Sequence, residues 1–330
     1  MKVLISSHAY WPAIGGLEVT AENIARRAAA DGHEVIVITQ TASAVERNDG
    51  VAMVRGPNPL RLLSLFRWAD RVIARHPSVR LNWPVLVTRK PFTIWYASHV
   101  RGGGGILSGW LLRRIEAAGF RIANSEFVRG KIPGCAAVIF PGYDEQVFRR
   151  EIAWSSRAAD FIFVGRLEPE KGIQTLIEAM QRFPHSRLTI VGRGSGQAGY
   201  ECLAGKLGLQ ARISFAGAKS QAECNALLNR HKVLVVPSRY EEPFGKVAVE
   251  GLAAGCRVVV SDRGGLKEAG GPAALLFRAG EVGSLAHAMA KALEPAEHLR
   301  LLAEAHVADC TFAAAYRQLA RLAGLDGGVT

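Results

Sequence analysis

Two glutamates in the stretch RYEEPFGKVAVE have a spacing that suits the binding of sugar hydroxyls. Glu242 precedes a predicted helix and Glu250 lies on it, with seven residues between them. A carboxylate accepts hydrogen bonds from two neighbouring hydroxyls, so two carboxylates at one strand end can hold a sugar and a ribose. Pro243 and Gly245 predict a turn that leaves backbone amides exposed at the start of the helix, where phosphate can bind. A capping glutamate followed by a surface glutamate is the simpler alternative.

Two cations follow an apolar run in the segment VGRLEPEKG. Arg166 and Lys171 are predicted to stand at the carboxyl end of that strand, and a helix begins near Gly172. A planar guanidinium together with a flexible ammonium group suits a diphosphate. The alternative is a solvent-exposed loop in which Glu168 and Glu170 pair with the two cations.

Paired glycines follow the first apolar run of the chain. Gly15 and Gly16 lie directly before a stretch of helical period, Leu17–Asp31. Glycines there let backbone amides approach an anion, although a tight strand-to-helix turn is the alternative. The glycines of residues 192–196 come too late in the chain and lack the third glycine of a dinucleotide motif, which argues against a nicotinamide-dependent dehydrogenase.

Short apolar runs alternate with amphipathic stretches along the whole chain. Runs rich in Val, Ile and Phe predict strands covered on both faces, and their alternation with helices predicts an α/β fold with parallel sheets. In such sheets ligands bind outside the carboxyl ends of the strands, which is where the motifs above fall. The predicted strands are KVLIS, EVIVIT, VAMV, RVIA, FTIWYA, FRIAN, AAVIF, DFIFVG, RLTIVG, RISFAG, KVLVVP and CRVVVSD.

The alternation stops at residues 141–159 and then restarts. This predicts two doubly wound domains, residues 1–150 and 151–330, with the two cations and the two glutamates in the second. Residues 284–322 are predicted to form two or three terminal helices.

Composition excludes several classes of protein. With 330 residues, 49% hydrophobic and 21% charged, the chain is neither disordered nor collagen-like nor a small disulfide scaffold. Its five cysteines lack metal-ligand spacing and are typical of reduced thiols in a cytoplasmic protein. No run approaches the roughly 18 apolar residues of a membrane span, which favours a protein that is soluble or lies on a membrane surface.

Basic charge is concentrated in the first half. Residues 1–150 contain 20 Lys and Arg against 11 Asp and Glu, whereas residues 151–330 contain 21 against 18. This favours an anionic partner such as a membrane surface or an acidic glycan, and an ordinary basic surface is the alternative. Residues 59–75 mix arginines with Leu, Phe and Trp, which fits either an interfacial helix or a core-packed one.

In combination, these stretches resemble the retaining nucleotide-sugar glycosyltransferases of glycosyltransferase family 4. The resemblance covers nearly the whole chain and is most specific over residues 160–270, where the family's Glu-x7-Glu pattern falls on Glu242 and Glu250. It implies the GT-B fold, two Rossmann-like domains facing each other across a cleft, with acceptor-side residues in the first and donor-side residues in the second. The matching stretches are YWPAIGGLE, DGHEVIVIT, IANSEFVR, VIFPGYDEQVF, FVGRLEPEKGIQTLIEAM, LTIVGRGSG, ISFAG and VVPSRYEEPFGKVAVEGLAAGCRVVVSDRGGLKE.

The resemblance also implies site residues. Arg166 and Lys171 neutralise the donor diphosphate, Glu242 hydrogen-bonds the transferred sugar, and Glu250 holds the ribose hydroxyls. His99 faces the donor sugar from the first domain, with a buried structural histidine as its alternative. Backbone or glycine contacts to the donor fall on Gly15, Gly16, Gly165, Gly192, Phe244 and Gly245.

The implied reaction is transfer of a hexose from a nucleoside diphosphate to an acceptor hydroxyl with retention of configuration. It needs no metal ion and no cofactor. The implied acceptor is a glycan, a glycolipid or a small molecule, and the implied setting is the cytoplasm or the inner face of an anionic membrane, with no role for nucleic acid. The alternatives are a non-catalytic nucleotide-sugar-binding subunit of a glycan assembly complex and a nucleotide-sugar epimerase of the same fold.

The chain departs from the family pattern in three places. The segment between Met53 and Thr93 is shortened, and Arg193 stands where an acidic residue is usual. The helix that crosses back to the first domain in this family is expected to end early.

Overall fold

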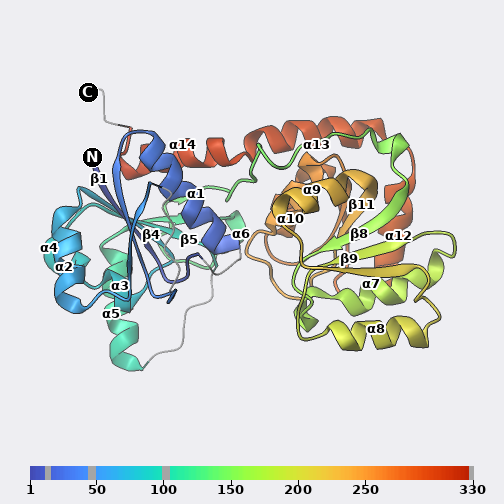
Figure 1. The fold of residues 1–330 in the computed structure, drawn as a ribbon, viewed down its shortest axis with the longest axis horizontal. Helices are drawn as coiled ribbons and strands as arrows, with labels where there is room; N and C mark the ends of the chain where they lie inside the picture. The colour runs from blue at the N-terminus through green and yellow to red at the C-terminus, as the bar shows by residue number, and fades with distance from the viewer. Residues whose placement is uncertain (12–15, 44–49, 99–104, 327–330) are drawn as a thin grey trace. The chain divides into compact units, whose positions relative to one another are not determined.

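The structure is a computed structural model that describes residues 1–11, 16–43, 50–98 and 105–326. Contacts divide the chain into two compact units, each with its own parallel sheet (Figure 1). Unit 1 is Met1–Pro141 together with the chain from Ala315 onward, and unit 2 is Gly142–Ala314. The division therefore falls nine residues before the expected boundary at 150, and the C-terminal residues pack with unit 1 instead of ending in the second domain.

The reason for the earlier division lies in the backbone after Gly142. The Tyr143 amide donates to the carbonyl of Cys310 at 3.0 Å, and the Glu151 amide donates to Asn229 Oδ1 at 2.7 Å. Residues 143–151 are thus tied to unit 2 by hydrogen bonds that no local pattern reveals.

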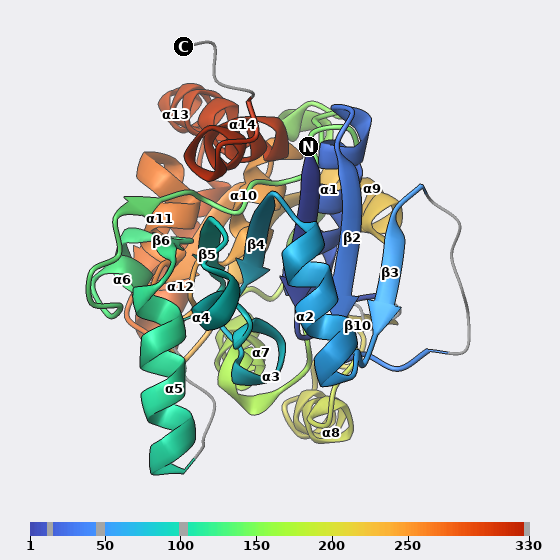
Figure 2. The same cartoon turned by 90° about the vertical axis from the view of Figure 1, so that its left-hand side faces the viewer.

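Unit 1 contains a seven-stranded parallel sheet, in the part of the chain that is described, with strand order β3-β2-β1-β4-β5-β6-β7 (Figure 2). Its strands are β1 (Lys2–Ser7), β2 (Glu34–Thr39), β3 (Ala52–Arg55), β4 (Arg71–Arg75), β5 (Phe92–Tyr96), β6 (Phe120–Ala123) and β7 (Ala137–Val138). Its helices are α1 (Gly16–Ala30), α2 (Pro59–Trp68), α3 (Val79–Asn82), α4 (Val85–Thr88), α5 (Ile106–Ala117), α6 (Glu126–Arg129) and most of α14 (Phe312–Ala323).

Helix α2 and strand β4 settle the alternative for residues 59–75. Leu62, Leu65 and Phe66 of α2 are buried in one cluster with strand residues such as Val72. The segment is therefore core-packed and not an interfacial helix. No helix of the described residues combines the length and apolar character needed to cross a bilayer.

Unit 2 contains a six-stranded parallel sheet, again counting described residues, with order β10-β9-β8-β11-β12-β13. Its strands are β8 (Ala159–Val164), β9 (Leu188–Val191), β10 (Ile213–Gly217), β11 (His231–Val236), β12 (Arg257–Ser261) and β13 (Leu275–Phe277). Its α-helices are α7 (Ile173–Ala179), α8 (Gln197–Lys206), α9 (Gln221–Arg230), α10 (Lys246–Ala253), α11 (Leu266–Gly270), α12 (Val282–Leu293) and α13 (Glu297–Asp309). Its 3₁₀ turns are η1 (Trp154–Ser156), η2 (Pro169–Lys171), η3 (Met180–Arg182) and η4 (Gly271–Ala273).

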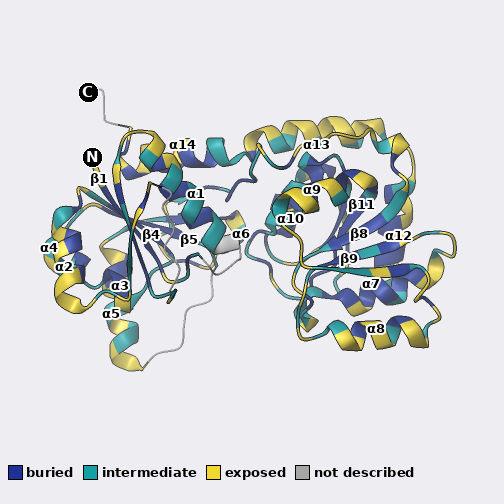
Figure 3. Ribbon diagram, in the orientation of Figure 1, coloured by how far each residue is buried: buried dark blue, intermediate teal, exposed yellow. Residues whose placement is uncertain are grey.

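The central strands β8, β11 and β12 of unit 2 are mostly buried, as their unbroken apolar runs predict, whereas the outer strands β10 and β13 are partly exposed (Figure 3). On one face Phe161, Phe163 and Val235 pack with α7 and α12. The strand order reverses between β8 and β11, because successive strands extend the sheet outward from each of these two. Open α/β sheets bind ligands in the crevice at this switch point, outside the carboxyl ends of the strands. The predicted fold class, two doubly wound α/β domains, is confirmed.

Candidate active site

The site lies in unit 2, where the loops after β8 and β11 leave the switch point. Glu242 follows β11 and is buried, with 7% of its surface exposed. Its Oε1 accepts a hydrogen bond from Lys171 Nζ, in the loop after β8, at 2.7 Å. The sequence placed these two residues after two different strands of one domain, and the structure shows that the strands are neighbours and that the two charges are in direct contact.

Two hydroxyl groups complete the surroundings of Glu242. Ser238 Oγ donates to Oε1 at 2.6 Å, and the Tyr240 hydroxyl donates to Oε2 at 2.5 Å. Lys171 Nζ also donates to the Tyr240 hydroxyl at 3.3 Å and lies 4.9 Å from the centre of its ring. Burial, and then the charge of Glu242, raise the pKa of Tyr240, so this phenol stays protonated and acts as a donor.

Arg166 is the exposed member of the predicted cation pair. It lies 3.4 Å from Glu170, and 68% of its side chain is accessible. The positive charge of Arg166 partly opposes the rise in the pKa of Tyr240. Arg166 therefore interacts electrostatically with the group formed by Glu242, Lys171, Ser238 and Tyr240. Glu168 has a different partner, because it accepts hydrogen bonds from the hydroxyl and amide of Ser195, and these lower the pKa of Glu168. The solvated-loop alternative therefore fits Arg166 and does not fit Lys171.

Glu250 is a poorly satisfied carboxylate on α10. Only 15% of its side chain is exposed, and Lys246 Nζ lies 3.9 Å away. Desolvation raises the pKa of Glu250, with Lys246 acting in the opposite direction. Among the described residues, no donor lies within hydrogen-bonding distance of this carboxylate, so its oxygens are open to the hydroxyls of a ligand.

Glycines allow three loops to approach one another around the site. Gly245 precedes α10 with φ +97°, and a Cβ there would lie 2.3 Å from Leu266 Cδ2. Gly192 has φ +138°, and a Cβ there would lie 1.8 Å from the carbonyl oxygen of Gly165. Both glycines have a positive φ that other residues rarely adopt, and at Gly192 a Cβ would also overlap a backbone oxygen, so glycine is required for this loop packing. Phe244 is buried beside Gly245, and the first amides of α10 have no partner within the helix.

Family models match both halves of the chain. The model described as "Glycosyl transferases group 1" matches residues 144–306, and the one described as "Glycosyltransferase Family 4" matches residues 14–135. Glycogen synthase of Mycobacterium tuberculosis is 30% identical over 342 aligned residues, which cover 82% of this chain and 80% of that protein. The chain belongs to glycosyltransferase family 4.

Other comparisons agree with this membership in family 4. D-inositol 3-phosphate glycosyltransferase of Mycobacterium bovis is 35% identical over 177 residues, which cover 49% of this chain and 37% of that protein. Anabaena HepE, solved in complex with UDP, has a TM-score of 0.83 at 19% identity, covering 99% of this chain and all of that chain. Sucrose-phosphate synthase of Thermosynechococcus elongatus has a TM-score of 0.76 at 21% identity, covering 100% of this chain and 99% of that one. These likenesses show the GT-B fold of family 4.

Ser238, Tyr240 and Gly264 are site residues that the sequence did not single out in this family member. Gly264, after β12, has φ +61°, and a Cβ there would lie 2.2 Å from the Glu242 carbonyl oxygen. The adjacent Gly265 amide donates to that same oxygen at 2.7 Å. The available signal was proximity, because Ser238 and Tyr240 share the loop of Glu242 and the Gly264–Gly265 pair follows the next strand in the sheet.

Three predicted site residues belong to the first half of the chain. Gly15 and His99 lie outside the described residues, and Gly16 is the first residue of α1. Their assigned contacts with a donor stay predictions. Within the described ranges, no group of three or more His, Cys, Asp and Glu side chains is placed to hold a metal ion.

Proposed function

We propose that this family 4 enzyme transfers a hexose from a nucleoside-diphosphate sugar to an acceptor hydroxyl with retention of configuration. The observation that carries the proposal is the Lys171–Glu242 pair at the switch point, beside the open carboxylate of Glu250. The crystal structures of HepE in complex with UDP and with UDP-glucose support a nucleotide-sugar donor. Lys171 and Arg166 bind the diphosphate, the amides at Phe244 and Gly245 add to that binding, and Glu250 holds the ribose.

Glu242 acts as a hydrogen-bond acceptor for the transferred sugar and not as a nucleophile. Its oxygens accept hydrogen bonds from Lys171, Ser238 and Tyr240, and this fixed arrangement suits an acceptor that orients the sugar hydroxyls. The reaction we propose is a substitution on one face of the sugar. The bond from C1 to the phosphate oxygen breaks, the acceptor oxygen bonds to C1 from the same side, and the acceptor proton passes to the departing diphosphate.

Protein cations replace a metal ion in this scheme. Lys171 and Arg166 oppose the charge that develops on the departing diphosphate, and fixed donors and cations of this kind stabilise a transition state without reorganising. Transfer is therefore expected to continue in the presence of a chelator such as EDTA. Gly15, Gly16 and His99 complete the donor contacts in the proposal by their resemblance to the family pattern.

The acceptor we propose is carried by a lipid at an anionic membrane surface. Helix α5 exposes Ile106 by 94%, Leu107 by 77% and Trp110 by 52%, and Arg113 and Arg114 follow one turn later. Apolar side chains next to cations are typical of helices that lie on anionic bilayers. The expected test is salt-sensitive co-sedimentation with anionic vesicles, lost when Ile106, Leu107 and Trp110 are changed to Ser. The control is Leu60→Ser, which removes an equally exposed leucine from α2.

The decisive experiment is a panel of nucleotide-sugars, read by release of the nucleoside diphosphate and by the anomeric configuration of the product. We expect retention, loss of transfer in Glu242→Ala, and weakened donor binding when Arg166 and Lys171 are both changed to Ala. Near-normal transfer in both variants would contradict the assigned site. Nucleotide binding with no turnover of any sugar would support the non-catalytic subunit instead.

A further inference from the structure

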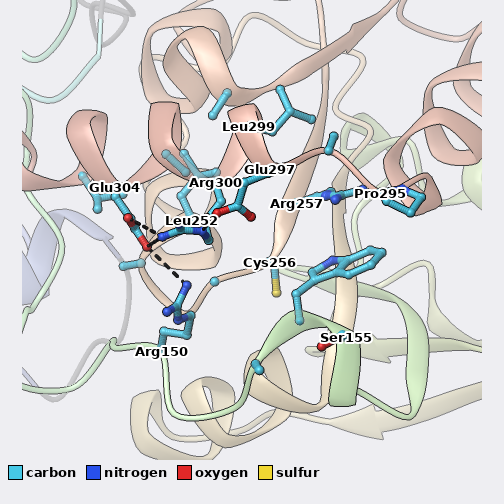
Figure 4. Close-up of a pocket in the computed structure, with 18 residues that line it drawn as sticks. Arg150, Ser155, Leu252, Cys256, Arg257, Pro295, Glu297, Leu299, Arg300 and Glu304 are labelled. Atoms are coloured by element: carbon cyan, nitrogen blue, oxygen red, sulfur yellow. Dashed lines mark hydrogen bonds and ion pairs between the residues drawn. The ribbon is translucent and has the colours of Figure 1, made fainter.

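A cavity of about 730 Å³ lies in unit 2, away from the candidate active site (Figure 4). Its walls include Cys256 and Arg257 at the amino end of β12, together with η1, the end of α10 and helix α13. Glu242 and Lys171 follow the carboxyl ends of β11 and β8. The strands are parallel, so the cavity lies at the amino ends of the strands and the active site at their carboxyl ends, and the two are separate sites.

Helix α13 covers this cavity without filling it. None of its 13 residues is buried, and the residues that line the cavity include Leu299, Ala303 and Val307, spaced at i, i+4 and i+8 on one helix face. Leu252 of α10 lines the cavity as well. Protein interiors are close-packed, and voids larger than a water molecule are few. An apolar hollow of this volume falls within the size range of small-molecule sites, roughly 300–1,000 Å³.

Two of the three arginines in the wall are paired with carboxylates. Arg150 lies 3.2 Å from Glu304, and Arg300 binds both Glu304 and Glu297 at 2.7 Å. Figure 4 shows these side chains pointing toward one another from the loop before β8 and from α13. Their charges nearly cancel.

Arg257 is the exception. In the described part of the chain, no carboxylate lies within 4 Å of it, and its guanidinium donates to the backbone oxygens of Ala292 and Glu294. The guanidinium lies 4.0 Å from the centre of the Trp154 ring. With three arginines against two glutamates, the wall keeps one positive charge at the edge of an apolar space.

We propose that this cavity binds an amphiphilic anion, namely an apolar chain that carries one carboxylate. The apolar body lies against Leu299, Ala303 and Leu252, and the carboxylate faces Arg257. Binding here does not depend on the sugar-transfer reaction, because no residue of the cavity belongs to the proposed active site.

The probes are hexanoate, octanoate and decanoate, used below their micelle concentrations in isothermal titration calorimetry. Each added methylene is expected to tighten binding by about fourfold while the chain stays enclosed. 1-Octanol and octyltrimethylammonium are expected to bind at least about tenfold more weakly than octanoate, because neither accepts a charge-assisted hydrogen bond from Arg257. Equal affinity for octanol and octanoate, or no dependence on chain length, would overturn the proposal.

A matched pair of variants locates the site. Ala303→Phe fills the cavity and is expected to weaken octanoate binding at least about tenfold, whereas Ala305→Phe adds the same side chain to the exposed face of the same helix and leaves binding unchanged. Thermal unfolding and nucleotide binding, both near the wild-type values, show that the two variants are folded. Undiminished octanoate binding in Ala303→Phe would refute the location. Arg257→Gln is expected to lose the preference for octanoate over octanol, and Arg257→Lys to keep it.

Discussion

Glu242→Gln is expected to tighten the binding of a nucleoside diphosphate while it slows sugar transfer by about 10²-fold. In the structure Lys171 Nζ lies 2.7 Å from Glu242 Oε1, and only 16% and 9% of the two side chains are exposed. A diphosphate that uses Lys171 must therefore compete with this carboxylate, which also repels the phosphate charges. Glutamine keeps the shape of the side chain but has no charge, and its single amide oxygen can accept from Ser238 or from Tyr240, while the amide nitrogen takes the other position as a donor.

The size of the effect follows from the hydrogen bond that is exchanged. A hydrogen bond that involves a charged group contributes about 1.5–3 kcal/mol. The bond from the Lys171 ammonium to the neutral amide of the variant falls at the lower end of this range, and the bond to the Glu242 carboxylate, in which both partners are charged, falls at the upper end. Releasing Lys171 is thus easier in the variant by up to about 1.4 kcal/mol, which corresponds to a dissociation constant up to about tenfold lower.

Calorimetric titration with UDP, GDP and ADP measures this change. The control is Glu241→Gln, which removes a negative charge from the neighbouring exposed residue of the same loop and is expected to change affinity far less. Lys171→Met is expected to weaken nucleotide binding, and this loss of affinity should be larger when it is measured in the Glu242→Gln variant than in the wild type. Unchanged or weaker nucleotide binding in Glu242→Gln alone would refute the competition between the carboxylate and the diphosphate.

Three further outcomes are expected. The pKa of Glu250 is raised by burial, so on acidification this carboxylate should gain a proton at a higher pH than an exposed glutamate does, and nucleotide affinity should fall with it. The fall should be absent in Glu250→Gln, and a persistent fall would assign it to another group. Gly192→Ala should lower the free energy of unfolding by at least about 2 kcal/mol in urea denaturation, because its Cβ would meet a backbone oxygen. The control Gly199→Ala adds a methyl group in open space on α8 and should raise the free energy of unfolding by up to about 1 kcal/mol. Similar values for the two variants would contradict the loop packing. Arg75 is fully buried with no carboxylate partner among the described residues, and burial lowers its pKa to about 9. Arg75→Met should therefore raise the free energy of unfolding by about 1–3 kcal/mol. A clear decrease in the free energy of unfolding would show that stacking on Trp95 outweighs desolvation.

The strands, and the position of Lys171 and Glu242 at one crevice of the second domain, could be predicted from the sequence, but the direct contact between these two side chains could not. Each of the twelve apolar runs became a strand, because strands buried on both faces need unbroken apolar sequence, and parallel strands bring their carboxyl ends to one edge. Strand β13 was missed since its three residues, Leu275–Phe277, are too few to show a pattern. The division by contacts comes nine residues before the expected boundary at 150, because the hydrogen bonds that tie residues 143–151 to unit 2 join residues far apart in sequence, such as Tyr143 and Cys310.

The two hydroxyl donors at Glu242 could not be predicted from the sequence. Ser238 and Tyr240 carry no motif, and their role depends on the loop path that Gly264 allows by lying against the Glu242 carbonyl. A glycine pair after one strand thus decides which side chains surround a carboxylate after another. The spacing of residues within a single loop does not reveal that the path of the loop depends on a glycine pair elsewhere in the chain.

The two predicted cations, Arg166 and Lys171, differ in exposure and pairing, which implies that they act at different stages of donor binding. Arg166 is largely exposed and has one loose partner at 3.4 Å, so its charge acts on an approaching diphosphate from solution. Lys171 is mostly buried and already paired, so it contributes only after the diphosphate has displaced it from Glu242. Because that displacement breaks a contact between the loops after β8 and β11, donor binding and the arrangement of the Glu242 cluster are linked through one ammonium group.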